Sequence, residues 1–138
     1  MRTTQILSLS FLSITLAAAV LNVACSDIIN AANPFGEQQA RCELRPGKSQ
    51  CTDIRKFKGP SLVTFQGVCT SLTAASKDAG GYTEKSTCGD VSTMWGGCQT
   101  KSADGSLQTN WYYKGGEYAT IDDAKKNCDS GQTWVDPA

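Results

Sequence analysis

The hydrophobic pattern divides the chain into an apolar start and a longer part with short strand and helix patterns. Residues 6–21, ILSLSFLSITLAAAVL, are apolar with scattered Ser and Thr, and Met1-Arg2 place a positive charge before them. A basic start, a short apolar core and small residues at its end form an export signal. A transmembrane helix needs about 20 strongly apolar residues, and the Ser and Thr dilute this stretch. We therefore predict a cleaved signal peptide over residues 1–24.

Two later segments repeat apolar residues at helical spacing and end in cysteine. Aligned at these cysteines, their positions match as Ser61 with Thr120, Leu62 with Ile121, Phe65 with Ala124 and Cys69 with Cys128. Ser and Thr are good helix N-caps, and apolar residues at i, i+3 and i+7 form one face of a helix. The pattern therefore predicts two short helices.

Turn residues separate the strand patterns. Asp104-Gly105 favours a two-residue hairpin turn because both residues tolerate positive φ. Pro46-Gly47 favours a type II turn, because Pro fixes φ and Gly accepts a positive φ. The predicted hairpins pair residues 98–101 with 107–113 and residues 40–44 with 49–57. Together with the helices they predict a small α+β domain, an antiparallel sheet with two short helices on one face.

The aromatic residues permit two interpretations, a hydrophobic core or a platform on which a sugar could stack. The candidates are Tyr82, Trp95, Trp111, Tyr113 and Trp134. A small domain needs large side chains for burial, and Trp and Tyr each bury much area. We therefore interpret the five as core and expect Tyr112 and Tyr118 to be exposed.

Charge and composition exclude several classes of function. The chain has 13 Lys plus Arg and 13 Asp plus Glu, so no basic field favours nucleic acid. It has no histidine, which removes the usual general base and the Ser-His and Cys-His nucleophile systems. The carboxylates show no spacing that nominates an acid/base pair, and neither a P-loop nor a Rossmann glycine pattern occurs. We therefore expect a protein that is not an enzyme and binds no cofactor.

Seven cysteines make an odd count, and six of them lie where the strand and helix patterns are. These six are Cys42, Cys51, Cys69, Cys88, Cys98 and Cys128. In an exported chain such a set predicts three disulfide bonds. No zinc site is expected, because no pair has C-x-x-C spacing and histidine is absent.

A weak internal duplication favours one pairing of these cysteines. One unit starts near Cys51 and the other near Cys98, and each reads as strand, turn, helix ending in cysteine, and short strand. The pairing that respects this duplication is Cys51–Cys69, Cys98–Cys128 and Cys42–Cys88. In a competing pairing, Cys42 bonds to Cys51, because the Pro46-Gly47 hairpin would set the two opposite each other.

Cys25 is the odd cysteine and directly follows the predicted signal. The residues before it, Leu21-Asn22-Val23-Ala24, resemble a relaxed lipobox of the spirochaete type, with Asn22 where the strict pattern has Leu. The resemblance implies that Cys25 becomes an acylated N-terminus, and two or more acyl chains give stable anchoring. Cleavage of an ordinary secretory signal, after Ala24 or near Ala32, is the alternative.

The polar and small residues that follow predict a tether. Residues 25–40 include Pro34 and Gly36, and a flexible chain of about 15 residues reaches roughly 20 Å. The cysteine-rich α+β domain is then expected over residues 41–138.

The second unit resembles a group of small, cysteine-rich bacterial lipoproteins that are abundant in spirochaetes. The shared pattern is a G-x-C segment, a YY strand, a short helix ending in Cys, and a closing G-G-T-[WF], where this chain has Gln132 for the second Gly. The matching residues are Gly97, Cys98, Tyr112, Tyr113, Tyr118, Ala119, Ala124, Cys128, Gly131, Thr133 and Trp134. The resemblance implies a location and a fold, and it assigns no activity.

These observations favour a non-enzymatic lipoprotein of the bacterial envelope, anchored in the outer membrane through acylated Cys25. Its expected partners are membrane lipid and another envelope protein or a host protein, with no metal and no nucleic acid. The alternative is a freely secreted, disulfide-rich inhibitor or effector-like protein in which Cys25 is lost or free. A hydrolase that uses paired carboxylates is a third hypothesis.

Overall fold

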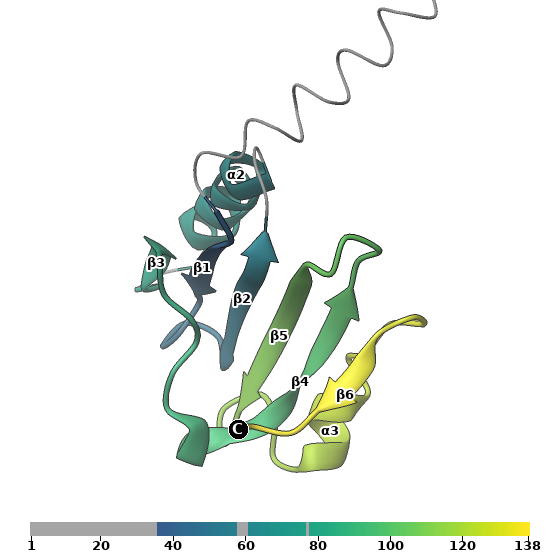
Figure 1. Ribbon diagram of the computed structural model, residues 1–138. Helices are drawn as coiled ribbons and strands as arrows, with labels where there is room; N and C mark the ends of the chain where they lie inside the picture. The colour runs from purple at the N-terminus through teal and green to yellow at the C-terminus, as the bar shows by residue number, and fades with distance from the viewer. Residues whose placement is uncertain (1–35, 58–60, 77) are drawn as a thin grey trace, which may run out of the picture. The chain divides into compact units, whose positions relative to one another are not determined.

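The computed structural model describes residues 36–57, 61–76 and 78–138 (Figure 1). The predicted signal peptide, Cys25 and most of the predicted tether lie outside these residues. All of the described residues belong to one compact unit. Its first strand begins at Gln38, so residues 38–40 of the predicted tether belong to the sheet.

Six antiparallel strands form one sheet in the order β3-β1-β2-β5-β4-β6 (Figure 1). The strands are β1 Gln38–Glu43, β2 Gln50–Phe57, β3 Gly81–Glu84, β4 Met94–Lys101, β5 Leu107–Tyr113 and β6 Thr133–Val135. The helices are α2 Ser61–Ala74 and α3 Ile121–Lys125, with a 3-10 turn η1 at Val91–Thr93. The predicted α+β fold with two short helices and three disulfide bonds is confirmed.

The sheet consists of two copies of one ββαβ plan. In the first unit β1 and β2 form a hairpin, α2 follows, and β3 returns to pair with β1. In the second unit β4 and β5 form a hairpin, α3 follows, and β6 returns to pair with β4. Pairing of β2 with β5 joins the units at the centre of the sheet. The duplication therefore begins at β1, earlier than the sequence pattern near Cys51 indicated.

One row of residues across the sheet includes the two cysteines that are bonded to the two helix segments. Strand pairing places Cys42, Thr52, Asn110 and Cys98 side by side on neighbouring strands, on one face. A disulfide bond joins Cys42 to Cys69 in α2, and another joins Cys98 to Cys128 just after α3. Because residues in register on neighbouring strands point to the same face, both helices cover the same side of the sheet.

The observed disulfide bonds correct two of the three favoured pairs. The observed bonds are Cys42–Cys69, Cys51–Cys88 and Cys98–Cys128. The predicted pairs Cys51–Cys69 and Cys42–Cys88, and the competing pair Cys42–Cys51, are therefore wrong. The reason is the register of the first hairpin, in which Cys42 pairs with Thr52 rather than Cys51. A shift of one residue turns a side chain to the opposite face. Cys51 therefore faces away from α2.

The face opposite the helices has its own small core. Cys51, Cys88, Met94, Trp111 and Tyr113 pack there, each at most 6% exposed. The connection between β3 and β4 crosses this face and is held by the Cys51–Cys88 bond. Both faces of the sheet are therefore packed around Trp111, Tyr112 and Tyr113 at the end of β5.

The turn of the first hairpin differs from the predicted type II turn, because the Arg45–Pro46 peptide bond is cis. The hairpin itself has nearly the predicted limits, with strands at 38–43 and 50–57.

Candidate functional site

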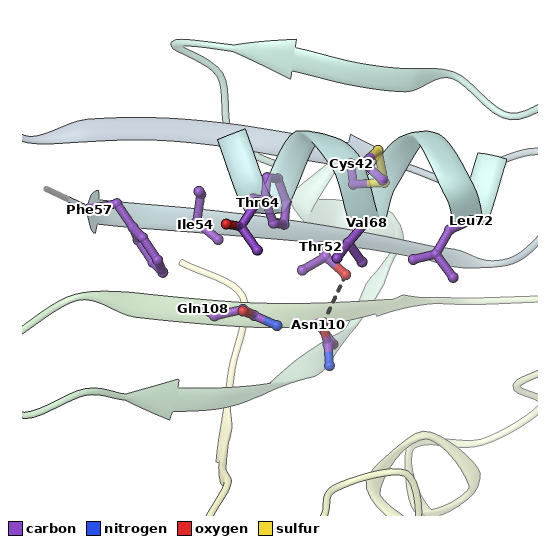
Figure 2. Close-up of a pocket in the computed structure, with 11 residues that line it drawn as sticks. Cys42, Thr52, Ile54, Phe57, Thr64, Val68, Leu72, Gln108 and Asn110 are labelled. Atoms are coloured by element: carbon purple, nitrogen blue, oxygen red, sulfur yellow. Dashed lines mark hydrogen bonds between the residues drawn. A yellow bond between two sulfur atoms is a disulfide. The ribbon is translucent and has the colours of Figure 1, made fainter. Parts of the chain in front are cut away.

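A groove lies beside α2 on the helical face of the sheet, with a volume of about 470 Å³ (Figure 2). Its lining residues come from β1, β2, α2 and β5. They are Cys42, Thr52, Ile54, Phe57, Thr64, Phe65, Val68, Cys69, Leu72, Gln108 and Asn110. The size falls within the range of ligand sites, about 300–1,000 Å³.

One side of α2 forms the wall of the groove. Residues three and four apart share a helix face, so Thr64, Val68 and Leu72 line one flank (Figure 2). Cys69 points into the sheet and is 1% exposed, because its disulfide bond to Cys42 fixes the helix there. The Cys42–Cys69 bond holds α2 over β1 and β3, and the groove opens beside the helix over Thr52, Gln108 and Asn110.

The central strands form the floor. Ile54 on β2 is fully buried, and Thr52 Oγ1 donates a 2.9 Å hydrogen bond to Asn110 Oδ1 across the β2–β5 junction (Figure 2). Since the Asn110 carbonyl oxygen accepts this bond, the amide Nδ2 donors point away from Thr52. Gln108 brings a second side-chain amide to the same floor.

The groove carries no charge. None of its lining residues is acidic or basic, and the two cysteines are bonded to each other. The whole of α2, SLVTFQGVCTSLTA, contains no ionisable side chain, since Cys69 is disulfide-bonded. Yet Val63, Val68 and Leu72 of this helix are 72%, 54% and 46% exposed. The uncharged composition and these exposed aliphatic side chains make the groove side of α2 the candidate binding surface of the described residues.

The equivalent region of the second unit is filled with aromatic side chains. Tyr112 and Tyr118 meet edge to face at 5.0 Å between ring centroids, and Tyr112 stacks with Trp134 at 6.4 Å. Both tyrosines are buried, at 3% and 7% exposure, so the prediction that they are exposed is wrong. Burial raises the pKa of Tyr112 to about 12. The alternation of strand β5 is as predicted, but both faces are packed at its Trp111–Tyr113 end.

All five of the other aromatic residues belong to or pack against buried clusters, but only two of them are fully buried. Trp111 and Tyr113 are 6% and 3% exposed, whereas Tyr82, Trp95 and Trp134 are half-buried. Trp95 donates from Nε1 to the Tyr118 carbonyl oxygen at 3.0 Å, which ties it to the α3 side of the sheet.

Asp53 is a buried charged residue whose role the sequence pattern did not single out. Its Oδ2 accepts hydrogen bonds from the Cys88 backbone N–H and Trp111 Nε1, both at 3.1 Å, and from Arg55 Nη2 at 3.0 Å. Asp53 is fully buried on the face opposite the helices. It therefore holds the Cys88 segment against the sheet and has no part in the groove.

The structure brings the predicted cysteines together only in pairs, and Cys25 lies outside the described residues. Within residues 36–57, 61–76 and 78–138, no group of three or more His, Cys, Asp or Glu is placed to hold a metal ion. No helix in that part of the chain is long and apolar enough to cross a membrane. The sequence patterns did not predict the groove. The feature of the sequence that could have indicated it is the absence of charged residues over residues 61–74.

The chain matches no protein-family model, no curated protein and no solved structure.

Proposed function

We propose that this protein is a lipid-anchored envelope lipoprotein whose folded unit is a non-enzymatic interaction module. The observation that carries the proposal is the uncharged groove beside α2. Acid–base, nucleophilic and metal catalysis all need ionisable or coordinating side chains. The groove offers apolar walls and neutral amide and hydroxyl groups, which suit recognition by burial and hydrogen bonding.

The cysteine pairing supports the anchor. Six cysteines bond to one another within the folded unit, which leaves Cys25 without a partner among them. Cys25 follows a predicted export signal and a relaxed lipobox, so acylation is the fate that fits its position. A module held on the membrane in this way presents its groove to other envelope or host proteins.

The anchor is tested by intact-mass analysis of the native protein, with and without reduction. We expect an N-terminus at Cys25, added mass from acyl chains, and three disulfide bonds. An unacylated N-terminus in the culture medium, at Cys25 or beyond it, would contradict the anchor and favour the secreted alternative.

The groove is tested by photo-crosslinking in intact cells. A photoreactive residue at Val68 should form a protein adduct, because Val68 lines the groove and is 54% exposed. The same residue at Val91 is the matched control, since Val91 is 44% exposed and lies outside the groove. If Val68 forms no adduct, or forms no more than Val91, the groove is not the interaction surface.

A further inference from the structure

The turn between β4 and β5 contains Asp104-Gly105, the type of dipeptide in which a side-chain carboxyl group and the next backbone nitrogen react most readily. Gly105 has φ +85°, and its backbone N–H donates to the Ser102 carbonyl oxygen at 3.0 Å. The Ser102 N–H donates in turn to the Ser106 carbonyl oxygen at 2.9 Å. These bonds close a three-residue hairpin loop with glycine in the left-handed region. The dipeptide is therefore held in one defined turn.

The Asp104 carboxyl group is turned back onto the chain that follows it. Its Oδ1 accepts hydrogen bonds from the Ser106 backbone N–H at 3.0 Å and from Ser106 Oγ at 2.7 Å. An aspartate that bonds the backbone two residues on forms an Asx-turn, whose ring mimics a β-turn. The Gly105 nitrogen is a member of this ring. The side-chain carbonyl carbon Cγ of Asp104 is therefore held on the same side of the chain as that nitrogen.

The surroundings leave the two reacting atoms accessible. A Cβ at Gly105 would meet no atom within 4 Å, so the space beside the glycine is open. Glycine itself has no side chain to block the approach of its nitrogen to Cγ. Asp104 is exposed, so water reaches its carboxyl group. The turn thus brings a nucleophile, an electrophile and solvent together.

We propose that Asp104 converts spontaneously to isoaspartate, which makes this turn a site of backbone modification. The Gly105 nitrogen attacks Cγ of the protonated carboxyl group, a bond forms between nitrogen and Cγ, and the amide proton and the carboxyl OH leave together as water. The product is a five-membered succinimide ring. Water then adds to either ring carbonyl. Opening at the backbone carbonyl breaks its bond to the Gly105 nitrogen and gives isoaspartate, whereas opening at Cγ restores aspartate.

The reaction has a structural consequence for the hairpin. One water molecule is released and one is consumed, so no other reactant is needed. The main chain of the turn gains one methylene carbon, and the hydrogen bonds among Ser102, Gly105 and Ser106 lose their spacing. Gln108 of the groove floor lies two residues beyond Ser106. The modification therefore weakens the end of the β4–β5 hairpin that is close to the groove. The inference does not depend on the partner of the groove or on the anchor.

The test is incubation of the natively processed, disulfide-bonded protein in heavy-oxygen water at neutral pH and body temperature. After reduction and cleavage at lysine in ordinary water, residues 102–114 form a peptide in which Asp104 is the sole aspartate. Fragmentation in the mass spectrometer localises the heavy oxygen and distinguishes isoaspartate from aspartate. We expect both signals to accumulate at residue 104 several times faster than at Asp129, which precedes a serine. Absence of isoaspartate at residue 104, or a rate no higher than that at Asp129, overturns the proposal.

Two pairs of measurements test the mechanism. Asp104→Glu keeps the charge but requires a six-membered ring, so it should abolish the product, and an undiminished rate of labelling would overturn the succinimide. Ser106→Ala removes the 2.7 Å bond to Oδ1 and should slow the reaction several-fold, whereas Ser102→Ala keeps the backbone bonds of the turn and should not. In the reduced chain in urea, Ser106→Ala and the unchanged protein should react equally. Equal rates in the folded state would overturn the Asx-turn as the cause.

Discussion

The two ββαβ units of this protein share a strand order and a disulfide bond from the first strand to the helix segment, yet their helices differ in length and charge. Helix α3 has five residues, begins with a capping box between Thr120 and Asp123, and carries acidic residues in its first turn and Lys125 in its last. Helix α2 has 14 residues, no acidic residue in its first turn and no basic residue in its last. One helix thus carries charges that complement its dipole, and the other carries none.

The surfaces beneath the two helices differ in the same sense. Ala124 in α3 is fully buried and packs in a cluster with Cys98, Tyr112 and Tyr118. Beneath the flank of α2 lies a groove of about 470 Å³. The second unit therefore completes its own core, whereas the first leaves apolar surface that a further element can cover. The duplicated plan therefore has one copy that packs its own aromatic side chains and one that carries the proposed interaction surface.

The largest expected effect comes from removing the disulfide bond that holds each helix segment to the sheet, Cys42–Cys69 in the first unit and Cys98–Cys128 in the second. Their sequence separations are 27 and 30 residues, so the chain-entropy model gives each bond about 3.5 kcal/mol of stability. We expect Cys42→Ser/Cys69→Ser and Cys98→Ser/Cys128→Ser to lower the free energy of unfolding by similar amounts. Urea denaturation of the two double variants measures both.

Clearly unequal losses of stability would show that the two disulfide bonds have different roles. Loss of the Cys98–Cys128 bond also frees a five-residue helix that is too short to be stable alone. If Cys98→Ser/Cys128→Ser loses more stability than the other variant and fluorescence shows that Tyr112 is exposed, the Cys98–Cys128 bond also holds the aromatic cluster in place. A larger loss for the variant that lacks the Cys42–Cys69 bond would mean that the cluster around Cys69 and Phe65 contributes more stability than the one around Ala124.

The second prediction contrasts packing under the two helices with one substitution. Ala124→Leu should destabilise the fold by about 2 kcal/mol, because the buried site has no room for three more carbon atoms. Ala74→Leu, at the exposed end of α2, should change stability by less than about 0.5 kcal/mol. Thermal or urea unfolding of both variants is the measurement, and equal effects would contradict the difference in packing.

Local patterns along the chain predicted the elements well, and long-range placement was beyond them. The start of α3 after Thr120 followed from its capping residue, whereas α2 already includes Ser61, the residue that aligns with Thr120. The disulfide partners of Cys42 and of Cys51 could not be predicted, because they depend on the register of the first hairpin. A shift of one residue in that register turns a side chain to the opposite face of the sheet. The burial of Tyr112 depends on a helix that arrives from later in the chain.

The groove was unpredictable for the same physical reason. Apolar residues of 61–74 indicated a helix, but the position of that helix over β1 and β3 is set by the Cys42–Cys69 bond. Only that position leaves Thr52 and Asn110 at the surface of the groove. The uncharged composition of the segment was visible in the sequence and acquires meaning once the helix is seen to be exposed.

The third prediction concerns helix capping. Thr120 Oγ1 accepts a hydrogen bond from the Asp123 backbone N–H at 3.2 Å, so Thr120→Ala should cost about 1 kcal/mol. Thr70 in α2 instead donates to the Gln66 carbonyl oxygen within the helix, and Thr70→Ala should be neutral or slightly stabilising. Chemical denaturation of the pair checks this contrast. A loss at Thr70 as large as that at Thr120 would contradict it.

The smallest expected effect is a pH dependence confined to the second unit. The Asp123 carboxylate accepts hydrogen bonds from the Thr120 hydroxyl at 2.7 Å and from Lys126 Nζ at 3.1 Å, and these hold its pKa below the ordinary value. A carboxyl with a lowered pKa in the folded state adds stability above its unfolded pKa of about 3.9, and this is lost as pH falls through the folded pKa. In acid, α3 should therefore lose support while α2, which has no carboxylate, does not. Hydrogen exchange of the two helices between neutral and acidic pH measures this, and Asp123→Asn should remove the pH dependence of α3.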